Sequence, residues 1–156
     1  MSRNVHIRPF EPADVLDFAV QPAQACEAPS RADAIALALL AISERPVSAE
    51  CADGRVRLIG GISGGEEHSV ALIALFAEDA GPWMLGIVRA VRSWLTECSA
   101  HRIAMEVRAD FEPGRKFAEM LGFEAEGVMR ARGPNREDYM LFARIADTDV
   151  ASEVAA

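Results

Sequence analysis

The sequence has few of the residues that mark disulfide-linked or metal-binding proteins. Its three cysteines, Cys26, Cys51 and Cys98, are far apart and form no CxxC pattern. We therefore expect free thiols rather than a disulfide framework. The three histidines are isolated, with no other His or Cys at metal-ligand spacing. This absence predicts that the chain has no metal site.

Positive charge and long apolar stretches are also scarce. Lys and Arg number 16 against 24 Asp and Glu, a formal net charge of −8. Nucleic-acid binding draws most of its affinity from a basic surface, so we expect no nucleic-acid partner. The longest apolar stretches, residues 34–42 and 70–77, are shorter than the roughly 20 residues of a membrane helix. The first ten residues contain no apolar core of a signal peptide. We expect a soluble protein of the cytoplasm without a membrane partner.

What the chain does have is enough apolar sequence for one core. It has 156 residues, of which 51% are hydrophobic, a size and composition typical of a single domain. We find no internal repeat and no linker. We expect one domain over residues 1–146 and an acidic tail over residues 147–156.

The apolar periodicity alternates between strand and helix along this domain. Alternation, continuous apolar runs and an Asp-Gly turn predict strands at residues 5–8, 47–51, 56–62, 69–77, 102–107, 126–132 and 138–145. Helical spacing and first-turn signals predict helices that begin near Pro12, Ser30, Gly81 and Glu112. Gly122 is placed to end the last helix. The order is β-α-α-β-β-β-α-β-α-β-β, which predicts an α/β protein with a mixed sheet and helices on both faces.

Four glycines, Gly60, Gly61, Gly64 and Gly65, raise the question of a phosphate-binding loop. Their spacing matches neither GxGxxG nor GxxxxGK[ST], and no helix follows them. A turn between two strands is the better interpretation.

The predicted order of elements, together with two motifs, resembles the GNAT acetyltransferases. Residues 105–123 resemble the family signature L-x-V-x-x-x-N-x-x-A-x-x-x-Y-x-x-x-G-F, including the Leu-Gly-Phe step at residues 121–123. The opening residues 7–9 (IRP), followed by residues 12–14 (PAD), are also similar to the family. The resemblance covers nearly the whole chain and implies the GNAT fold.

The cofactor loop departs from the family pattern. In the family, a loop [RQ]-x-x-G-x-[GA] wraps the pyrophosphate of acetyl-CoA with backbone N–H groups at a helix N-terminus. Here the equivalent residues 83–88 read WMLGIV, so only Gly86 matches. Pro82 removes one N–H donor, and Glu78 and Asp79 add negative charge. The resemblance therefore implies a degenerate site and no expected cofactor, or acetyl-CoA if the chain is an enzyme. By position, the cofactor-binding candidates are Ala77, Trp83, Met84, Leu85, Gly86, Ile87, Val88 and Arg89.

The acceptor side also departs from the family. A tyrosine often serves there as general acid, but Ala118 stands at its position, and the only tyrosine, Tyr139, falls in the last predicted strand. A carboxylate or an imidazole within reach of an amine could act as base. The candidates are Glu66, Glu67, His68 and Glu106, for each of which an ordinary solvated charge is the alternative.

Residues 82–86 (PWMLG) resemble the segment found at this place in GNAT-like proteins of tailed bacteriophages, including relatives of podophage internal virion protein A. In those proteins the fold persists while the cofactor loop is replaced. The resemblance implies a non-catalytic virion or assembly component that binds other virion or assembly proteins, with room for a homo-oligomer. Its location would then be the cytoplasm of a bacterial host or a virion. The alternatives are an acetyl-CoA-dependent N-acetyltransferase with an atypical pyrophosphate loop, and a small-ligand sensor.

Overall fold

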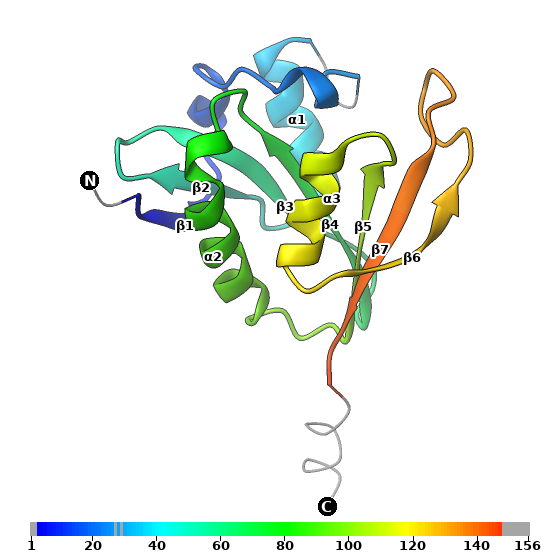
Figure 1. The fold of residues 1–156 in the computed structure, drawn as a ribbon. Coiled ribbons are helices and arrows are strands. Elements are labelled where there is room, and N and C mark those ends of the chain that lie inside the picture. Colours follow the sequence, from blue (N-terminus) through cyan, green and yellow to red (C-terminus); the bar gives the residue numbers. More distant parts are fainter. Residues whose placement is uncertain (1–2, 27, 29, 148–156) are drawn as a thin grey trace, which may run out of the picture. The chain divides into compact units, whose positions relative to one another are not determined.

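The computed structural model describes residues 3–26, 28 and 30–147, except for the side chains of residues 65 and 66. Within this part the chain forms a mixed sheet with helices, as predicted (Figure 1). Residues 148–156 of the predicted tail lie outside the described residues. The elements in chain order are β1 (Val5–Pro9), the 3-10 helices η1 (Pro12–Val15) and η2 (Pro22–Gln24), α1 (Ala32–Ile42), β2 (Val47–Cys51), β3 (Val56–Glu66), β4 (Ser69–Phe76), η3 (Gly81–Trp83), α2 (Met84–Leu95), β5 (Arg102–Arg108), α3 (Glu112–Met120), β6 (Glu124–Met129) and β7 (Tyr139–Ile145).

The strands are hydrogen-bonded in the order β1-β2-β3-β4-β5-β7-β6. β4 and β5 run parallel, with Val70 opposite Ile103. The pairs β1–β2, β2–β3, β5–β7 and β6–β7 are antiparallel. A parallel pair requires a crossover, which α2 provides between β4 and β5. The predicted change from hairpins to a β-α-β unit is thus confirmed.

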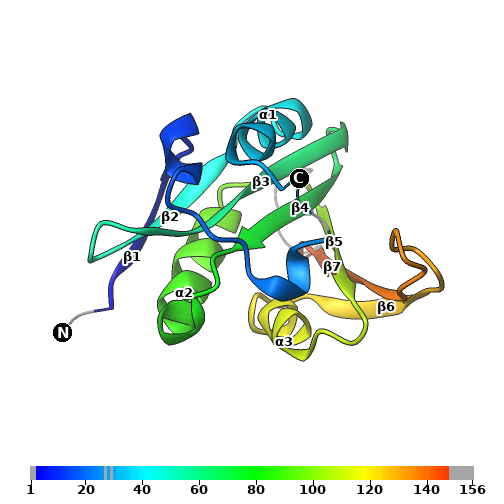
Figure 2. The same cartoon turned by 90° about the horizontal axis from the view of Figure 1, so that it is seen from above.

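The chain divides into two compact units, the first of which holds the residues up to Ser63 and Leu72–Cys98. In this unit α1 and α2 lie on opposite sides of β2 and β3 (Figure 2). Apolar side chains from η1, α1 and the strands form the core on the α1 side. Its buried members are Phe10, Val15, Phe18, Ile35, Ala36, Leu39, Ile59 and Ala77.

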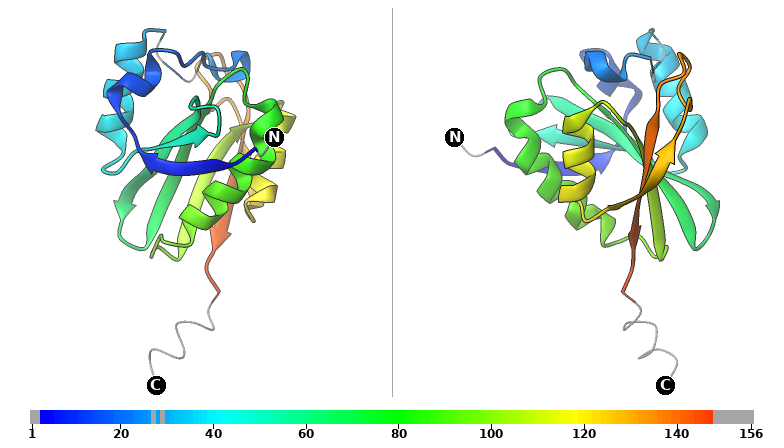
Figure 3. Two further views of the ribbon diagram at one scale, coloured as in Figure 1. Left: turned by 90° about the vertical axis from the view of Figure 1, so that its left-hand side faces the viewer. Right: turned by 45° about the vertical axis from the view of Figure 1, so that its right-hand side comes forward.

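The second unit holds Gly64–Ala71 and the residues from Ser99 onward. Its strand β7 lies between β5 and β6 (Figure 3, right). Helix α3 packs against β5, and Gly114 permits this, because a Cβ at that position would lie 2.8 Å from Val107. Gly122 follows the helix with a φ of +89°, which confirms its predicted role as the terminating residue.

Three details differ from the sequence predictions. The first predicted helix is only the 3-10 turn η1. Helix α1 has Arg31 rather than Ser30 as its N-cap and no capping hydrogen bond from a side chain. Strand β3 continues past residue 62, so the glycine-rich segment is strand rather than a turn. A Cβ at Gly60 would collide with the backbone carbonyl of Ile73, so glycine is needed for the close approach of β3 and β4.

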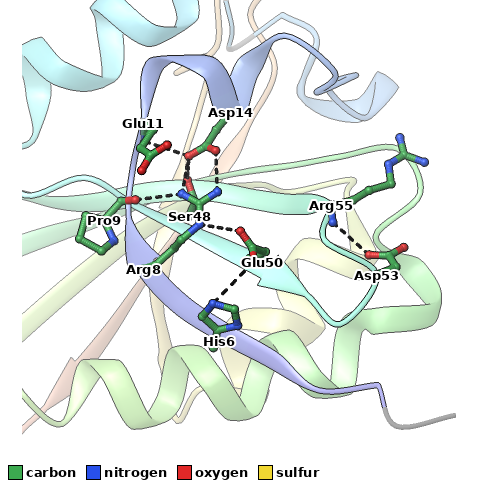
Figure 4. Close-up of polar contacts among 9 residues, drawn as sticks. All are labelled: His6, Arg8, Pro9, Glu11, Asp14, Ser48, Glu50, Asp53 and Arg55. Carbon is green, nitrogen blue, oxygen red and sulfur yellow. Dashed lines mark hydrogen bonds and ion pairs between the residues drawn. The ribbon is translucent and has the colours of Figure 1, made fainter.

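A polar network fixes η1 to the first two strands (Figure 4). The Arg8 guanidinium donates to both carboxylate oxygens of Asp14, at 2.9 and 2.7 Å, and its Nε donates to Glu50 at 2.7 Å. The hydroxyl of Ser48, which is fully buried, donates to Asp14 at 2.7 Å. Asp14 also accepts the Glu11 amide, so the same side chain caps the start of η1.

Three further observations bear on function. Cys26, Cys51 and Cys98 are all free thiols. Among the described residues, no three His, Cys, Asp or Glu side chains gather closely enough to hold a metal ion. In the same part of the chain, every helix is too short or too polar to cross a membrane.

Candidate functional site

The first candidate region is the start of α2, where the sequence places a remnant of a pyrophosphate loop. The turn η3 precedes the helix, and backbone amides of this turn donate hydrogen bonds to carbonyls within the same turn. Trp83 donates its N–H to the carbonyl of Ala80, and Met84 donates to Gly81. Pro82 has no N–H to donate. These amides therefore do not form the outward-pointing cradle that binds phosphate at many helix N-termini.

A charged cluster lies beside this turn and was not predicted. The guanidinium of Arg57, on β3, is 4.8 Å from the ring centre of Trp83. It donates to both oxygens of Asp53, at 2.7 and 2.8 Å, and lies 3.1 Å from Asp79. Asp79 also pairs with Arg55 at 3.3 Å. Two positive and two negative charges thus cancel locally, which leaves little field to attract an anion.

Burial and pairing make this cluster a fixed part of the structure. The Arg57 side chain is only 6% exposed. The hydrogen bonds with Asp53 raise the pKa of Arg57, and the same contact lowers the pKa of Asp53 to about 2. Arg57 thereby joins the β2–β3 turn, which holds Asp53, to the segment between β4 and α2, which holds Asp79. A buried guanidinium paired in this way stays charged at all ordinary pH values.

Gly86 is the one family glycine that the sequence retains, and the structure gives it another role. A Cβ at Gly86 would lie 2.6 Å from the carbonyl oxygen of Arg3 and 2.8 Å from the Val5 side chain. In Figure 3 (left) the beginning of β1 lies against α2. The Arg3 guanidinium also donates to the Pro82 carbonyl at 2.8 Å. Gly86 is therefore explained by helix–strand packing rather than by an approaching phosphate.

The remaining cofactor candidates divide into buried and exposed residues. Ala77, Ile87 and Val88 are core residues, at most 5% exposed. Leu85 and Arg89 are exposed, and Trp83 and Met84 are partly buried. Arg92 is exposed one turn beyond Arg89. In the described part of the chain, neither Arg89 nor Arg92 forms a salt bridge. The exposed face of α2 is thus the part of this region with positive charge available to a ligand.

The predicted bases do not come together. Glu67 and His68 lie in the turn between β3 and β4, where the His68 ring stacks on His101 with centres 5.3 Å apart. Ser69, the next residue, pairs with Arg102. Glu106 is four residues further along β5, about 13 Å at the usual rise per strand residue. Glu66 ends β3, and its side chain lies outside the described part.

Glu106 forms a salt bridge. It is exposed on β5, and its carboxylate lies 3.1 Å from the Arg132 guanidinium. Ala118, at the position of the family's tyrosine, is completely buried in α3, so no larger side chain fits there without repacking. Tyr139 is buried at the start of β7, opposite Arg108.

Comparisons of the whole backbone with solved structures identify the architecture. Ard1 from Thermoplasma volcanium is 19% identical, with a TM-score of 0.72 over 92% of this chain and 98% of that chain. A GNAT-family acetyltransferase from Bacillus anthracis is 14% identical, with a TM-score of 0.71 over 93% and 96%. The chain has the fold of the GNAT acetyltransferases.

A third GNAT-like neighbour, yncA from Salmonella typhimurium, was solved with its cofactor acetyl-CoA. It is 12% identical, with a TM-score of 0.69 over 92% of this chain and 95% of that chain. No protein-family model matches the sequence, and the search of curated proteins found no match. Identities this low establish the GNAT fold alone, since one fold supports many functions.

Proposed function

We propose that the chain is an acetyl-CoA-dependent N-acetyltransferase that binds the cofactor phosphates with arginine side chains instead of the usual backbone loop. The observation that carries this proposal is the likeness to acetyltransferases across more than nine tenths of both chains, including a neighbour solved with acetyl-CoA. The altered pyrophosphate loop decides how the cofactor would be held.

The residues at α2 fit an anionic ligand in this altered way. The amides of Trp83 and Met84 are used inside the 3-10 turn, so they offer little to a phosphate. Arg89 and Arg92 present exposed guanidinium groups, which bind phosphate oxygens through two parallel N–H donors. The side of Gly81 is open, because no atom lies within 4 Å of the place that a Cβ would occupy. When bound there, acetyl-CoA would supply the activated acetyl group.

We propose Glu106 as the group that accepts the proton from the acceptor amine. Its carboxylate is exposed on β5 and lies 3.1 Å from the Arg132 guanidinium. A positioned carboxylate is a competent general base for an amine. Glu67 and His68 are weaker candidates because they share a turn at the other end of the β4–β5 ladder.

Calorimetric titration with acetyl-CoA, paired with a melting-temperature shift, tests the cofactor proposal. We expect micromolar binding, which stabilises the folded chain by mass action. Replacing Arg89 and Arg92 by Gln should weaken binding by about tenfold or more, since hydrogen bonds to charged groups contribute roughly 1.5–3 kcal/mol each. The control variant is Arg31→Gln with Arg45→Gln, which removes two charges near α1. Absence of heat and of a shift at millimolar acetyl-CoA would overturn the proposal.

A second function is favoured by the closed turn beside Arg57. Trp83 covers a neutralised cluster, and Pro82 and η3 leave no ordinary phosphate loop. These features suit a GNAT-fold protein that acts by binding other proteins, such as a bacteriophage virion or assembly component. Failure to bind acetyl-CoA, together with detection of the chain by mass spectrometry in purified virus particles, would select this function. Acetyl transfer to any amine would exclude it.

A further inference from the structure

The end of β4 has two edges, and they find different partners. On one edge, the N–H of Ala77 donates to the carbonyl of Arg57 on β3 at 2.9 Å. Because alternate residues of a strand present their backbone groups to opposite edges, Phe76 and Glu78 face the outer edge, away from β3. The pairing of β4 with β5 covers Ser69–Ala71. The outer backbone groups at the end of β4 are therefore satisfied by another part of the chain.

A segment near the N-terminus provides these partners. Residues 19–24, which we call the strap, run antiparallel to the end of β4. The Gln21 amide donates to the Phe76 carbonyl at 2.9 Å, and the Glu78 amide donates to the Ala19 carbonyl at 2.8 Å. Figure 2 shows this blue segment beside the end of β4. The strap thus occupies the outer edge as a short added strand would.

Gln24 extends this pairing with its side chain instead of its backbone. Its carboxamide nitrogen donates to the Ala74 carbonyl at 2.8 Å, and its carboxamide oxygen accepts the Phe76 amide at 2.9 Å. A carboxamide has the donor and the acceptor of a peptide group. Gln24 is 8% exposed and is the only buried residue of the strap. It therefore occupies β4 in the way that an amide of a bound chain would.

The contacts of the strap with β4 are of a kind that a ligand can replace. The four hydrogen bonds described above all go to backbone groups of β4, and secondary amides offer the same donors and acceptors. Ala19 and Pro22 are exposed, while Val20 is half-buried against the core of the first unit. Segments with few buried apolar contacts open at a low cost in free energy. The strap can therefore leave β4 while the rest of the unit stays folded.

We propose that residues 19–24 are a displaceable strap over an amide-binding edge of β4, with the Gln24 carboxamide in the place of a ligand amide. The ligand is an extended chain that carries secondary amides, namely the pantetheine arm of acetyl-CoA. The identity of this ligand rests on the proposed function. Extended amide chains bind a strand edge through backbone hydrogen bonds. Because the closed strap uses the same groups, it lowers the apparent affinity by the fraction of molecules that are closed.

Amide hydrogen exchange, followed by NMR in the wild-type chain, tests whether the strap leaves. We expect acetyl-CoA to speed the exchange of the Gln21 amide, because this amide loses the Phe76 carbonyl. The Phe76 amide should stay slow, because the ligand accepts its hydrogen bond. A segment with a purely structural role would not show these opposite changes. If acetyl-CoA binds while the Gln21 amide stays as slow as in the free chain, the strap is overturned and the proposed function stands.

Replacing Gln24 by Ala tests the competition directly. Acetyl-CoA should bind this variant about tenfold more tightly in calorimetric titration, because the closed state loses two hydrogen bonds. The same gain is expected for pantetheine, which has the amides without the phosphates. The matched control, Gln21→Ala, removes a side chain of the same size but keeps both bonds between Gln24 and β4, so it should change binding far less.

The two ligands separate failure of the strap from failure of the proposed function. Unchanged, weaker or absent binding of both ligands by Gln24→Ala would overturn the strap. Tighter binding of pantetheine, together with no binding of acetyl-CoA, would support the strap and overturn the proposed function. Circular dichroism melts check that each variant is folded, and the exchange experiment on the wild-type chain needs no variant.

Discussion

Replacing Asp14 by Ala should destabilise the fold more than any exposed charge replacement. The Asp14 side chain is 7% exposed and accepts four hydrogen bonds, two from Arg8 and one each from Ser48 and the Glu11 amide. These contacts connect η1 with β1 and β2 (Figure 4). The Ala variant removes every acceptor at once.

The size of the effect follows from what each donor loses. The Ser48 hydroxyl is fully buried and would lose Asp14 as its acceptor. A buried group without a hydrogen-bond partner costs about 1–3 kcal/mol of folding free energy. Arg8 keeps Glu50 and the Pro9 carbonyl, so its loss is only partial. We expect a total of about 3 kcal/mol, which lowers the melting temperature of a chain of this size by roughly 6–12 °C.

Urea unfolding and thermal melts, both followed by circular dichroism, measure this effect. The control is Asp33→Ala, because the Arg31–Asp33 pair is 79% and 62% exposed and should contribute about 0–1 kcal/mol. If the two variants are equally stable, the network does not fix η1 and the reasoning is refuted.

The Asp14 contribution should also depend on pH. Burial raises the pKa of this carboxyl, but hydrogen bonds from Arg8, the Glu11 amide and Ser48 outweigh burial, and the pKa lies below its ordinary value. A carboxyl with a lowered folded-state pKa stabilises the protein above its unfolded-state pKa. The loss of unfolding free energy in the Ala variant should therefore be largest at neutral pH, and it should shrink as the pH falls below about 4. A deficit that is constant from pH 7 to pH 2 would contradict this account.

Two further predictions concern packing and reactivity. Gly86→Ala should destabilise the chain by about 1–3 kcal/mol because its Cβ would meet the Arg3 carbonyl at 2.6 Å, whereas Gly81→Ala, with open space, should be neutral in the same thermal melts. Stabilisation by Gly86→Ala, the usual helix result, would show that α2 does not pack on β1 as described. In a thiol titration, the exposed Cys26 should react at once, and Cys51 only on unfolding, because burial excludes reagent and raises the pKa of its thiol. Fast labelling of Cys51 in the folded Cys26→Ser variant would contradict this order. Labelling of the half-buried Cys98 would not.

Local signals predicted much of the fold because they are decided within a few residues. The Asp-Gly turn formed the β2–β3 hairpin, in which Gly54 has a φ of +82°. Gly122 ended α3, and the continuous apolar run became the central strand β4. The first helix was overestimated: only the 3-10 turn η1 forms there. The contacts of Asp14 with Arg8 of β1 and Ser48 of β2 were not predicted, because no local pattern reveals them.

The candidate site was harder to predict because its contacts join distant parts of the sequence. Arg57 was overlooked since a charged residue in a strand usually faces water, yet Asp53 and Asp79 compensate it in the interior. Gly86 fitted the family's phosphate glycine by position, but only the structure shows that β1 lies against it. The assignments of the catalytic and cofactor residues remain predictions.

Strand β6 ends the sheet with one edge open, since among the described strands it pairs with β7 alone. Residues 124–128 are exposed on both faces, and the ladder is irregular between Ala125 and Gly127. An open strand edge invites another chain to add to it. Here Glu124 is exposed on that strand, whereas Glu126, at the irregular position, is paired with Arg102 of β5. A charged residue and an irregular ladder on an edge strand both work against the fibril-like addition of further chains to the sheet.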